Sequence, residues 1–178
     1  MAKLHQLNKH KYLKPIEMVE LEMRLDNAKR KEARNVLMIR LLIKTGARGS
    51  EMLAIRPMDL HTETQSIFIM GLKDGKDREL PVPSKLFRQL EEVATGPKDK
   101  PIFPIALRTL QGIWYDIRPV EKKLHSLRHS FAFNLYVKTK DILLVKMALG
   151  HRSVQSTMVY LEHLYEQESF ERLVLVNG

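Results

Sequence analysis

The sequence predicts a mainly α-helical protein with a small antiparallel β-hairpin or sheet, which is an α+β fold. Apolar residues recur at helical spacing over most of the chain, and glycines that can end a helix follow several of these segments. Two short segments rich in Ile, Phe and Val flank an Asp-Gly pair, a combination typical of a β-hairpin. A chain of 178 residues with 44% apolar content is expected to form one domain with a substantial core.

The first helix is expected to begin at Pro15, because proline is tolerated at the first helical position. Ile16, Val19 and Met23 then recur at helical spacing up to about Asn27.

The second helix is expected over residues 33–44, which are apolar on nearly all sides, as in a central buried helix. Gly46 can supply its left-handed stop. Arg48 therefore lies in a tight turn, and Ser50 is expected to cap a short helix that ends near Ile55.

Two strands are expected at residues 66–70 and 78–82, because both segments are rich in Ile, Phe and Val. Asp74-Gly75 is a preferred pair for a tight hairpin turn, from which Lys73 would project. After the hairpin, Ser84 is expected to cap a helix that Gly96-Pro97 ends. Further helices are expected at about 109–117, 126–137, 141–149 and 153–161, followed by an amphipathic stretch at 165–176.

The charge of the chain indicates a polyanionic partner. The formal net charge is +9 and the pI is near 9.8, and lysines and arginines that neutralise phosphates release condensed counterions. The basic residues concentrate toward the N-terminus, where residues 1–50 carry twelve Lys and Arg against five acids. Residues 1–14 contain no apolar segment of a signal peptide, and the chain contains no cysteine, which excludes disulfides. We expect a cytoplasmic protein associated with the nucleoid.

Three separated segments carry residues suited to attack on a phosphodiester. The first contains Arg48, the second contains His125 and Arg128, and the third contains His151, with Tyr160 nine residues later. Two guanidinium groups, two imidazoles and a phenol can bind a phosphate and move protons without a metal ion.

These segments resemble the conserved boxes of the tyrosine recombinases, also called phage integrases. Residues 45–53 resemble the first box, residues 125–132 the second, and residues 149–151 with Tyr160 the stretch that ends in the nucleophile. Residues 71–78 are similar to the hairpin that carries the catalytic lysine of the family.

The resemblance extends from about Leu13 to Leu164 and implies the catalytic-domain fold of the family for residues 15–164. Residues 1–14 would then form a basic leader, and residues 165–178 a tail helix that docks on its own core or on a neighbouring protomer. Most members carry a helical core-binding domain before the catalytic domain. The sequence fits both a small single-domain member and an excised catalytic domain.

The resemblance also implies a role for each residue at the site. Arg48 and Arg128 would bind the non-bridging phosphate oxygens, since a planar guanidinium matches a phosphate and stays charged. His151 would donate a further hydrogen bond to the same oxygens. Glu51, three residues after Arg48, either orients that guanidinium or is an exposed first-turn acid.

Proton transfer would involve the remaining residues. A tyrosine has a pKa near 10, so attack by Tyr160 needs help with its proton, and His125 would assist. Lys73 would protonate the departing 5′ oxygen, with Lys76 as the alternative if the register of the hairpin differs.

These expectations describe a site-specific recombinase that forms a 3′-phosphotyrosine without metal, ATP or cofactor. Its partners would be double-stranded DNA, further copies of the chain up to a tetramer, and accessory DNA-bending proteins. Two alternatives are a non-catalytic regulator, with residues 141–160 as a helix-turn-helix, and a type IB topoisomerase. The DNA target sequence and the outcome of recombination are not encoded in these motifs.

Overall fold

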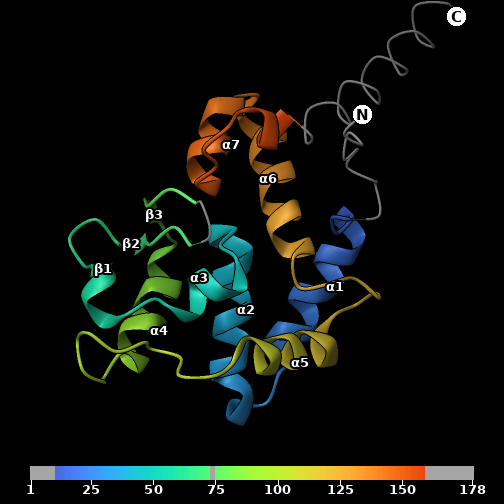
Figure 1. Cartoon of the computed structure of the whole chain (residues 1–178). Coiled ribbons are helices and arrows are strands. Elements are labelled where there is room, and N and C mark those ends of the chain that lie inside the picture. The colour runs from blue at the N-terminus through green and yellow to red at the C-terminus, as the bar shows by residue number, and fades with distance from the viewer. Residues whose placement is uncertain (1–10, 73–74, 159–178) are drawn as a thin grey trace, which may run out of the picture.

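The computed structural model describes residues 11–72 and 75–158. In this part of the chain, helices make up most of the fold and a small sheet lies at one side (Figure 1). The helices are α1 (Pro15–Asp26), α2 (Ala33–Thr45), α3 (Gly49–Leu53), α4 (Ser84–Val93), α5 (Leu107–Ile117), α6 (Ser126–Thr139) and α7 (Ile142–Leu149), with short 3-10 turns at Arg30–Glu32 and Pro57–Asp59. Strands β1 (Leu60–His61), β2 (Ser66–Ile69) and β3 (Arg78–Pro81) form an antiparallel sheet in the order β1-β2-β3. The predicted α+β class is confirmed.

Helix α1 begins at Pro15 as expected. The apolar residues whose spacing predicted the helix do not, however, face the core. Ile16, Val19 and Met23 lie exposed. Leu21 and Leu25 are buried in their place. Periodicity therefore located the helix without identifying its buried face.

Helix α2 is the central helix that the sequence predicted. Its apolar residues from Val36 to Leu42 are buried, and it packs against α4 and α6. Each such side chain contributes about 1.5–3 kcal/mol by leaving water. Gly46 ends the helix with a left-handed φ of 59°. A Cβ at this position would lie 2.3 Å from the ring of Phe131, so both the backbone and the packing require glycine.

Strands β2 and β3 each end one residue earlier than the sequence predicted. The ladder ends at the pair Ile69 and Arg78, so residues 70–77 connect the strands. This connection is one residue longer than the predicted 71–77, and the turn predicted at Asp74-Gly75 lies partly outside the described residues. The described part of this loop contains a turn in which the Gly75 N–H donates to the Leu72 carbonyl at 3.1 Å.

The later helices occur within a few residues of their predicted positions. Ser84 does not cap α4, because its hydroxyl donates to the Gln65 side-chain oxygen at 2.6 Å. Asp141 does cap α7, since its carboxylate accepts from the backbone N–H groups of Leu143 and Leu144 at 2.8 and 3.0 Å. Residues 155–158 begin the helix predicted at 153–161. The expected tail helix lies outside the described residues.

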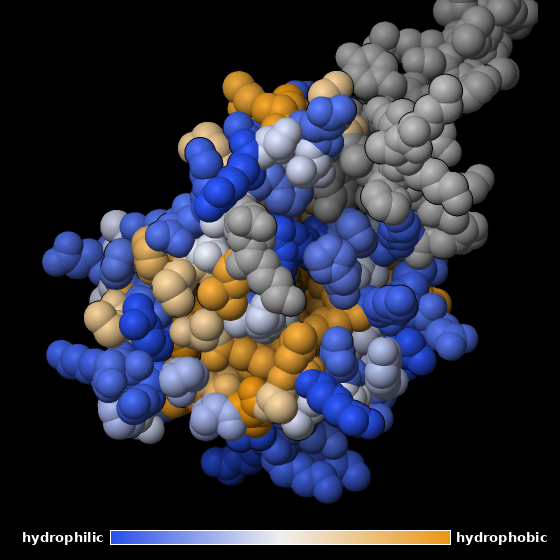
Figure 2. Space-filling model, viewed as in Figure 1, coloured by the Kyte–Doolittle hydropathy of each residue, from blue (hydrophilic) through white to orange (hydrophobic). Residues whose placement is uncertain are grey.

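The buried apolar residues form two clusters of unequal size. The main core is formed by residues of helices α1, α2, α3, α4 and α5, of the sheet and of the start of α6. The minor core lies between α6 and α7 and consists of Tyr12, Ala132, Val145 and Leu149, with partly buried neighbours. Figure 2 shows apolar side chains on the surface over α7, where Leu143, Leu144 and Met147 are exposed. None of the helices in residues 11–72 and 75–158 is long and apolar enough to cross a membrane.

Candidate active site

Arg48 lies in the turn between α2 and α3, which Gly46 opens. Its side chain is 29% exposed and therefore reaches the surface. The Glu51 carboxylate accepts hydrogen bonds from the Arg48 backbone N–H at 2.9 Å and from Nη1 at 2.6 Å. Arg48 is thus the residue that precedes α3, and Glu51, rather than the expected Ser50, satisfies the first free N–H group of this helix.

Glu51 is the carboxylate that brings three arginines together. Its side chain is fully buried. Arg78 Nη2 donates to Oε2 at 2.8 Å, and Arg128 Nη1 lies 3.7 Å from the same oxygen. Burial raises the pKa of Glu51, but the hydrogen bonds and charge of Arg78 and the hydrogen bonds of Arg48 outweigh it and hold the pKa below its ordinary value. The carboxylate therefore stays charged and orients Arg48, one of the two alternatives raised by the sequence.

Arg128 is a buried guanidinium, with 2% of the residue exposed. Nη1 donates to the Gly46 carbonyl at 2.8 Å and Nη2 donates to the Leu149 carbonyl at 2.7 Å. These carbonyls lie at the C-terminal ends of α2 and α7, where unpaired carbonyls carry partial negative charge. Arg128 therefore joins the ends of two helices and comes within reach of Glu51.

His125 precedes α6 and lies one helical turn before Arg128. Partial desolvation and the positive charges of Arg128 and Arg48 lower its pKa. The ring of His129 packs edge-on against the His125 ring, with centroids 4.7 Å apart. Burial, the neighbouring His125 and nearby cations lower the pKa of His129 to about 3. Both rings are therefore neutral at pH 7.

His151 follows Gly150, which ends α7 with a left-handed φ of 67°. Its Nδ1 lies 2.9 Å from the Thr157 hydroxyl. Burial and the charges of Arg128, Arg48 and Arg78 lower the pKa of His151 to about 4. A neutral imidazole retains one N–H group, which can donate a hydrogen bond to an anion.

The structure thus brings together Arg48, His125, Arg128 and His151 from three distant parts of the chain. The predicted roles of Lys73 and Tyr160 fall on residues outside the described ranges. The backbone N–H of Lys76 donates to the Gly150 carbonyl at 2.9 Å. This bond brings the β2–β3 loop, in which Lys73 lies by sequence, next to the turn before His151.

Sequence reasoning missed two residues of this cluster. Arg78 was noted only as the start of a strand, and nothing in a strand pattern indicates that its side chain crosses to Glu51. His129 is not among the residues that the sequence predicted for the site. Its spacing of four residues from His125 was a usable signal, since residues four apart are neighbours on a helix.

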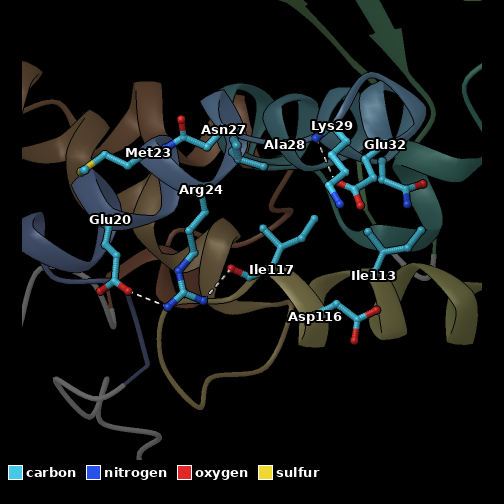
Figure 3. A pocket seen from close by; sticks show the side chains of 12 residues that line it. Glu20, Met23, Arg24, Asn27, Ala28, Lys29, Glu32, Ile113, Asp116 and Ile117 are labelled. Atoms are coloured by element: carbon cyan, nitrogen blue, oxygen red, sulfur yellow. Dashed lines mark hydrogen bonds and ion pairs between the residues drawn. The ribbon is translucent and has the colours of Figure 1, made fainter.

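A separate pocket of about 690 Å³ lies between α1, α5 and the start of α2. Figure 3 shows Arg24 at this pocket directed toward Glu20 and the end of α5. Arg24 pairs with Glu20 at 2.6 Å and donates to the Arg118 carbonyl at 2.8 Å. None of the described candidate residues lines this pocket. Because Arg24 is already paired and the predicted site residues lie elsewhere, we place no chemistry here.

Comparisons with known proteins agree with this arrangement. Residues 11–167 match the model of the phage integrase family. The chain is 32% identical over 155 residues to a tyrosine recombinase of Pseudothermotoga lettingae, covering 80% of this chain and 54% of that protein. It is 28% identical to tyrosine recombinase XerA of Pyrococcus furiosus, and the match covers 82% of this chain and 56% of that protein. The chain spans about half the length of these relatives.

Solved structures show the same likeness. XerH site-specific recombinase bound to a palindromic difH substrate after cleavage matches with a TM-score of 0.73 and 26% identity, covering 99% of this chain and 54% of that one. The catalytic domain of bacteriophage HP1 integrase matches with a TM-score of 0.64 and 26% identity, and the match covers 92% of this chain and 96% of that one. The matched family model, with the boxes that bring both arginines to one carboxylate, shows that this chain belongs to the phage integrase family, the tyrosine recombinases.

Proposed function

We propose that this protein is a site-specific DNA recombinase that cleaves and rejoins strands through a 3′-phosphotyrosine at Tyr160. The observation that carries the proposal is the convergence of Arg48 and Arg128 on the buried carboxylate of Glu51. Two guanidinium groups held in this way supply fixed positive charge for a phosphate. Metal and ATP are not needed in this scheme, because the arginines provide the charge and the covalent bond keeps the energy of the broken one.

The first chemical step forms a bond between the Tyr160 oxygen and phosphorus and breaks the bond from phosphorus to the 5′ oxygen. Arg48 and Arg128 bind the non-bridging oxygens, whose negative charge increases in the transition state. The phenol proton passes to His125, and a proton from Lys73 passes to the departing 5′ oxygen. In the reverse step, a 5′ hydroxyl of the same or another strand attacks the phosphotyrosine.

The protonation state of the histidines supports these roles. A general base has to be unprotonated before the reaction, and the lowered pKa of His125 leaves its ring neutral at pH 7. The lowered pKa of His151 makes it a hydrogen-bond donor rather than a cation. Among Arg48, His125, Arg128 and His151, only the two arginines therefore bring positive charge to the phosphate.

The partners of the whole protein are part of the proposal. Structures similar to this chain include a recombinase bound to its DNA substrate before and after cleavage, which supports double-stranded DNA as the substrate. We also propose assembly of up to four copies on DNA, with help from DNA-bending proteins, and docking of residues 165–178 on a neighbouring copy. An enzyme of this kind would work on chromosomal DNA in the cytoplasm.

Covalent capture on DNA tests the nucleophile. The full chain is incubated with a pool of nicked duplexes that tile the DNA flanking its own coding region, and denaturing gels followed by sequencing identify trapped complexes. Wild type is expected to form an adduct at one site. Tyr160→Phe is expected to bind the same duplex and form no adduct, because only the attacking hydroxyl is lost. Tyr115→Phe changes an exposed tyrosine on α5 outside the site, and this matched control should react normally.

Other outcomes identify the competing functions. An adduct of Tyr160→Phe at the wild-type level would remove this residue from the mechanism. Binding by wild type without any adduct would indicate a regulator. Cleavage that EDTA abolishes and Mg²⁺ restores would indicate a nuclease. Relaxation of supercoiled DNA without exchange between two captured sites would indicate a topoisomerase.

A further inference from the structure

Arg78, the first residue of β3, is a buried cation that the proposed chemistry does not use. Its side chain is 5% exposed, and Nη2 donates to Glu51 Oε2 at 2.8 Å. The strand therefore begins with a side chain that turns away from the sheet toward the carboxylate that also binds Arg48. This contact connects the β2–β3 hairpin to the phosphate-binding cluster.

The other side of Arg78 faces Gly150. A Cβ on Gly150 would lie 2.9 Å from Arg78 Nη1 and 2.5 Å from the carbonyl oxygen of Lys76. The Lys76 N–H donates in turn to the Gly150 carbonyl at 2.9 Å. Gly150 thus serves a second purpose besides its left-handed backbone, because it leaves space for the guanidinium to reach Glu51.

The burial of Arg78 is costly for the fold. Among the described residues, its Nε and Nη1 atoms are buried without a hydrogen-bond partner, and a buried charged donor without a partner is unfavourable. Arg48 and Arg128 also share the single negative charge of Glu51 with it. Replacing a buried ion pair by apolar side chains is often neutral or stabilising. Stability alone therefore does not explain an arginine here.

We propose that Arg78 is a positioning residue for strand cleavage. It fixes the β2–β3 hairpin, which carries the predicted general acid Lys73, against Glu51 and the turn at Gly150. The hairpin and the phosphate-binding arginines then keep a constant relative position during the reaction. This inference rests on the proposed function.

The contacts also indicate which step depends on Arg78. Without this side chain, Glu51 keeps both hydrogen bonds from Arg48, so the phosphate-binding side stays in place. The loop end of the hairpin loses its side-chain bond to Glu51 and keeps the backbone bond from Lys76 to Gly150. Loss of Arg78 is therefore expected to impair protonation of the leaving oxygen and to spare phosphate binding.

The test compares the full chain with Arg78→Met on the captured nicked duplex, made with either oxygen or sulfur at the bridging 5′ position. A thiolate leaves without protonation, whereas an alkoxide does not. On the oxygen duplex, Arg78→Met is expected to slow adduct formation by about 10- to 100-fold, the range for a misplaced catalytic group. On the sulfur duplex the loss should shrink to about threefold or less, as it should for Lys73→Ala. Arg78→Lys should restore part of the rate, because lysine can still reach a carboxylate.

The control variant is Arg40→Met, which removes an arginine paired with Glu22 and Asp26 far from this cluster and should react at the wild-type rate on both duplexes. A normal rate for Arg78→Met on the oxygen duplex, or an equal loss on both duplexes, would overturn the inference. If Arg78→Met does not fold, Arg78→Lys takes its place in both assays. If neither variant folds, Arg78 has a structural role and the inference is wrong. Absence of any adduct with wild type would instead contradict the proposed function.

Discussion

The two cores of this protein support the site from opposite sides and differ in how firmly they do so. The main core holds α2, α3 and the sheet, and with them Arg48 and Glu51. The minor core between α6 and α7 has four buried apolar residues in the described chain, and α7 leaves several of its apolar residues exposed. Since buried apolar area supplies most folding free energy, the side that bears His151 is the less firmly held. The site therefore depends on polar connections between the two sides.

The largest effect is expected at Arg128, which makes that connection. Arg128→Ala removes the guanidinium that donates to the Gly46 and Leu149 carbonyls and that we propose binds the phosphate. We expect adduct formation to fall about 10³-fold or more and the free energy of unfolding to fall by about 3 kcal/mol. Single-turnover kinetics measure the rate of adduct formation, and urea unfolding measures the free energy of unfolding. Arg128→Lys serves as the control for charge, and full activity of Arg128→Ala would show that the two cores hold the site independently.

The next largest effect tests the main-core side alone. Glu51→Gln removes the negative charge that holds three guanidinium groups, so we expect a loss of about 2–4 kcal/mol in unfolding free energy and about 100-fold in adduct formation.

The chain offers a matched control for this change. Asp59 accepts a hydrogen bond from the Arg56 backbone N–H at 2.9 Å and pairs with the Arg56 guanidinium. The two residues are three positions apart, as Arg48 and Glu51 are, but they lie outside the site. Asp59→Asn should cost about 1 kcal/mol and leave the cleavage rate within about threefold. Equal losses for both variants would mean that Glu51 acts only as a helix cap.

The last prediction concerns pH and the histidines at the start of α6 and after α7, His125, His129 and His151. Their folded-state pKa values are lower than the ordinary value of about 6.5, so the unfolded chain binds protons first as the pH falls. Stability is therefore complete above pH 6.5 and declines as the pH falls toward the folded-state pKa values of about 4 for His151 and about 3 for His129, by at most about 1.4 kcal/mol per pH unit for each of these two. Urea unfolding between pH 7.5 and 5.5 measures the decline.

Hydrogen exchange can locate this pH effect. At pH 5.5, after correction for the intrinsic rates, amides of α7 should lose protection before those of α2. His129→Asn should make the decline in stability with falling pH shallower than in wild type. A stability that stays constant from pH 7.5 to 5.5 would contradict the lowered pKa values.

The sequence was sufficient to predict what local patterns encode. It located α2 with its glycine stop at Gly46, both main strands, and the motif residues Arg48, His125, Arg128 and His151, since these follow from periodicity and from the spacing of the family boxes. The roles of Lys73 and Tyr160 remain predictions.

What the sequence did not show depends on contacts between distant segments. The face of α1 that is buried is decided by what packs against it, so Leu21 and Leu25 were not distinguished from Ile16 and Val19. The β2–β3 loop contacts the turn after α7 through the bond between Lys76 and Gly150, residues more than seventy positions apart. Arg78 joins Glu51 across 27 positions, and no local pattern encodes that pair.

One consequence of the shared carboxylate concerns preorganisation. Arg48, Arg78 and Arg128 place three positive charges around one negative charge inside the fold, and their mutual repulsion is overcome when the chain folds. A phosphate that arrives later meets charges already in place, so little reorganisation is left for the moment of reaction. The free protein is correspondingly less stable than its packing would allow, as is common where stability and activity compete. Removal of one arginine lowers stability, but replacement of the whole cluster by well-packed apolar side chains is expected to preserve or raise it and to abolish the proposed activity.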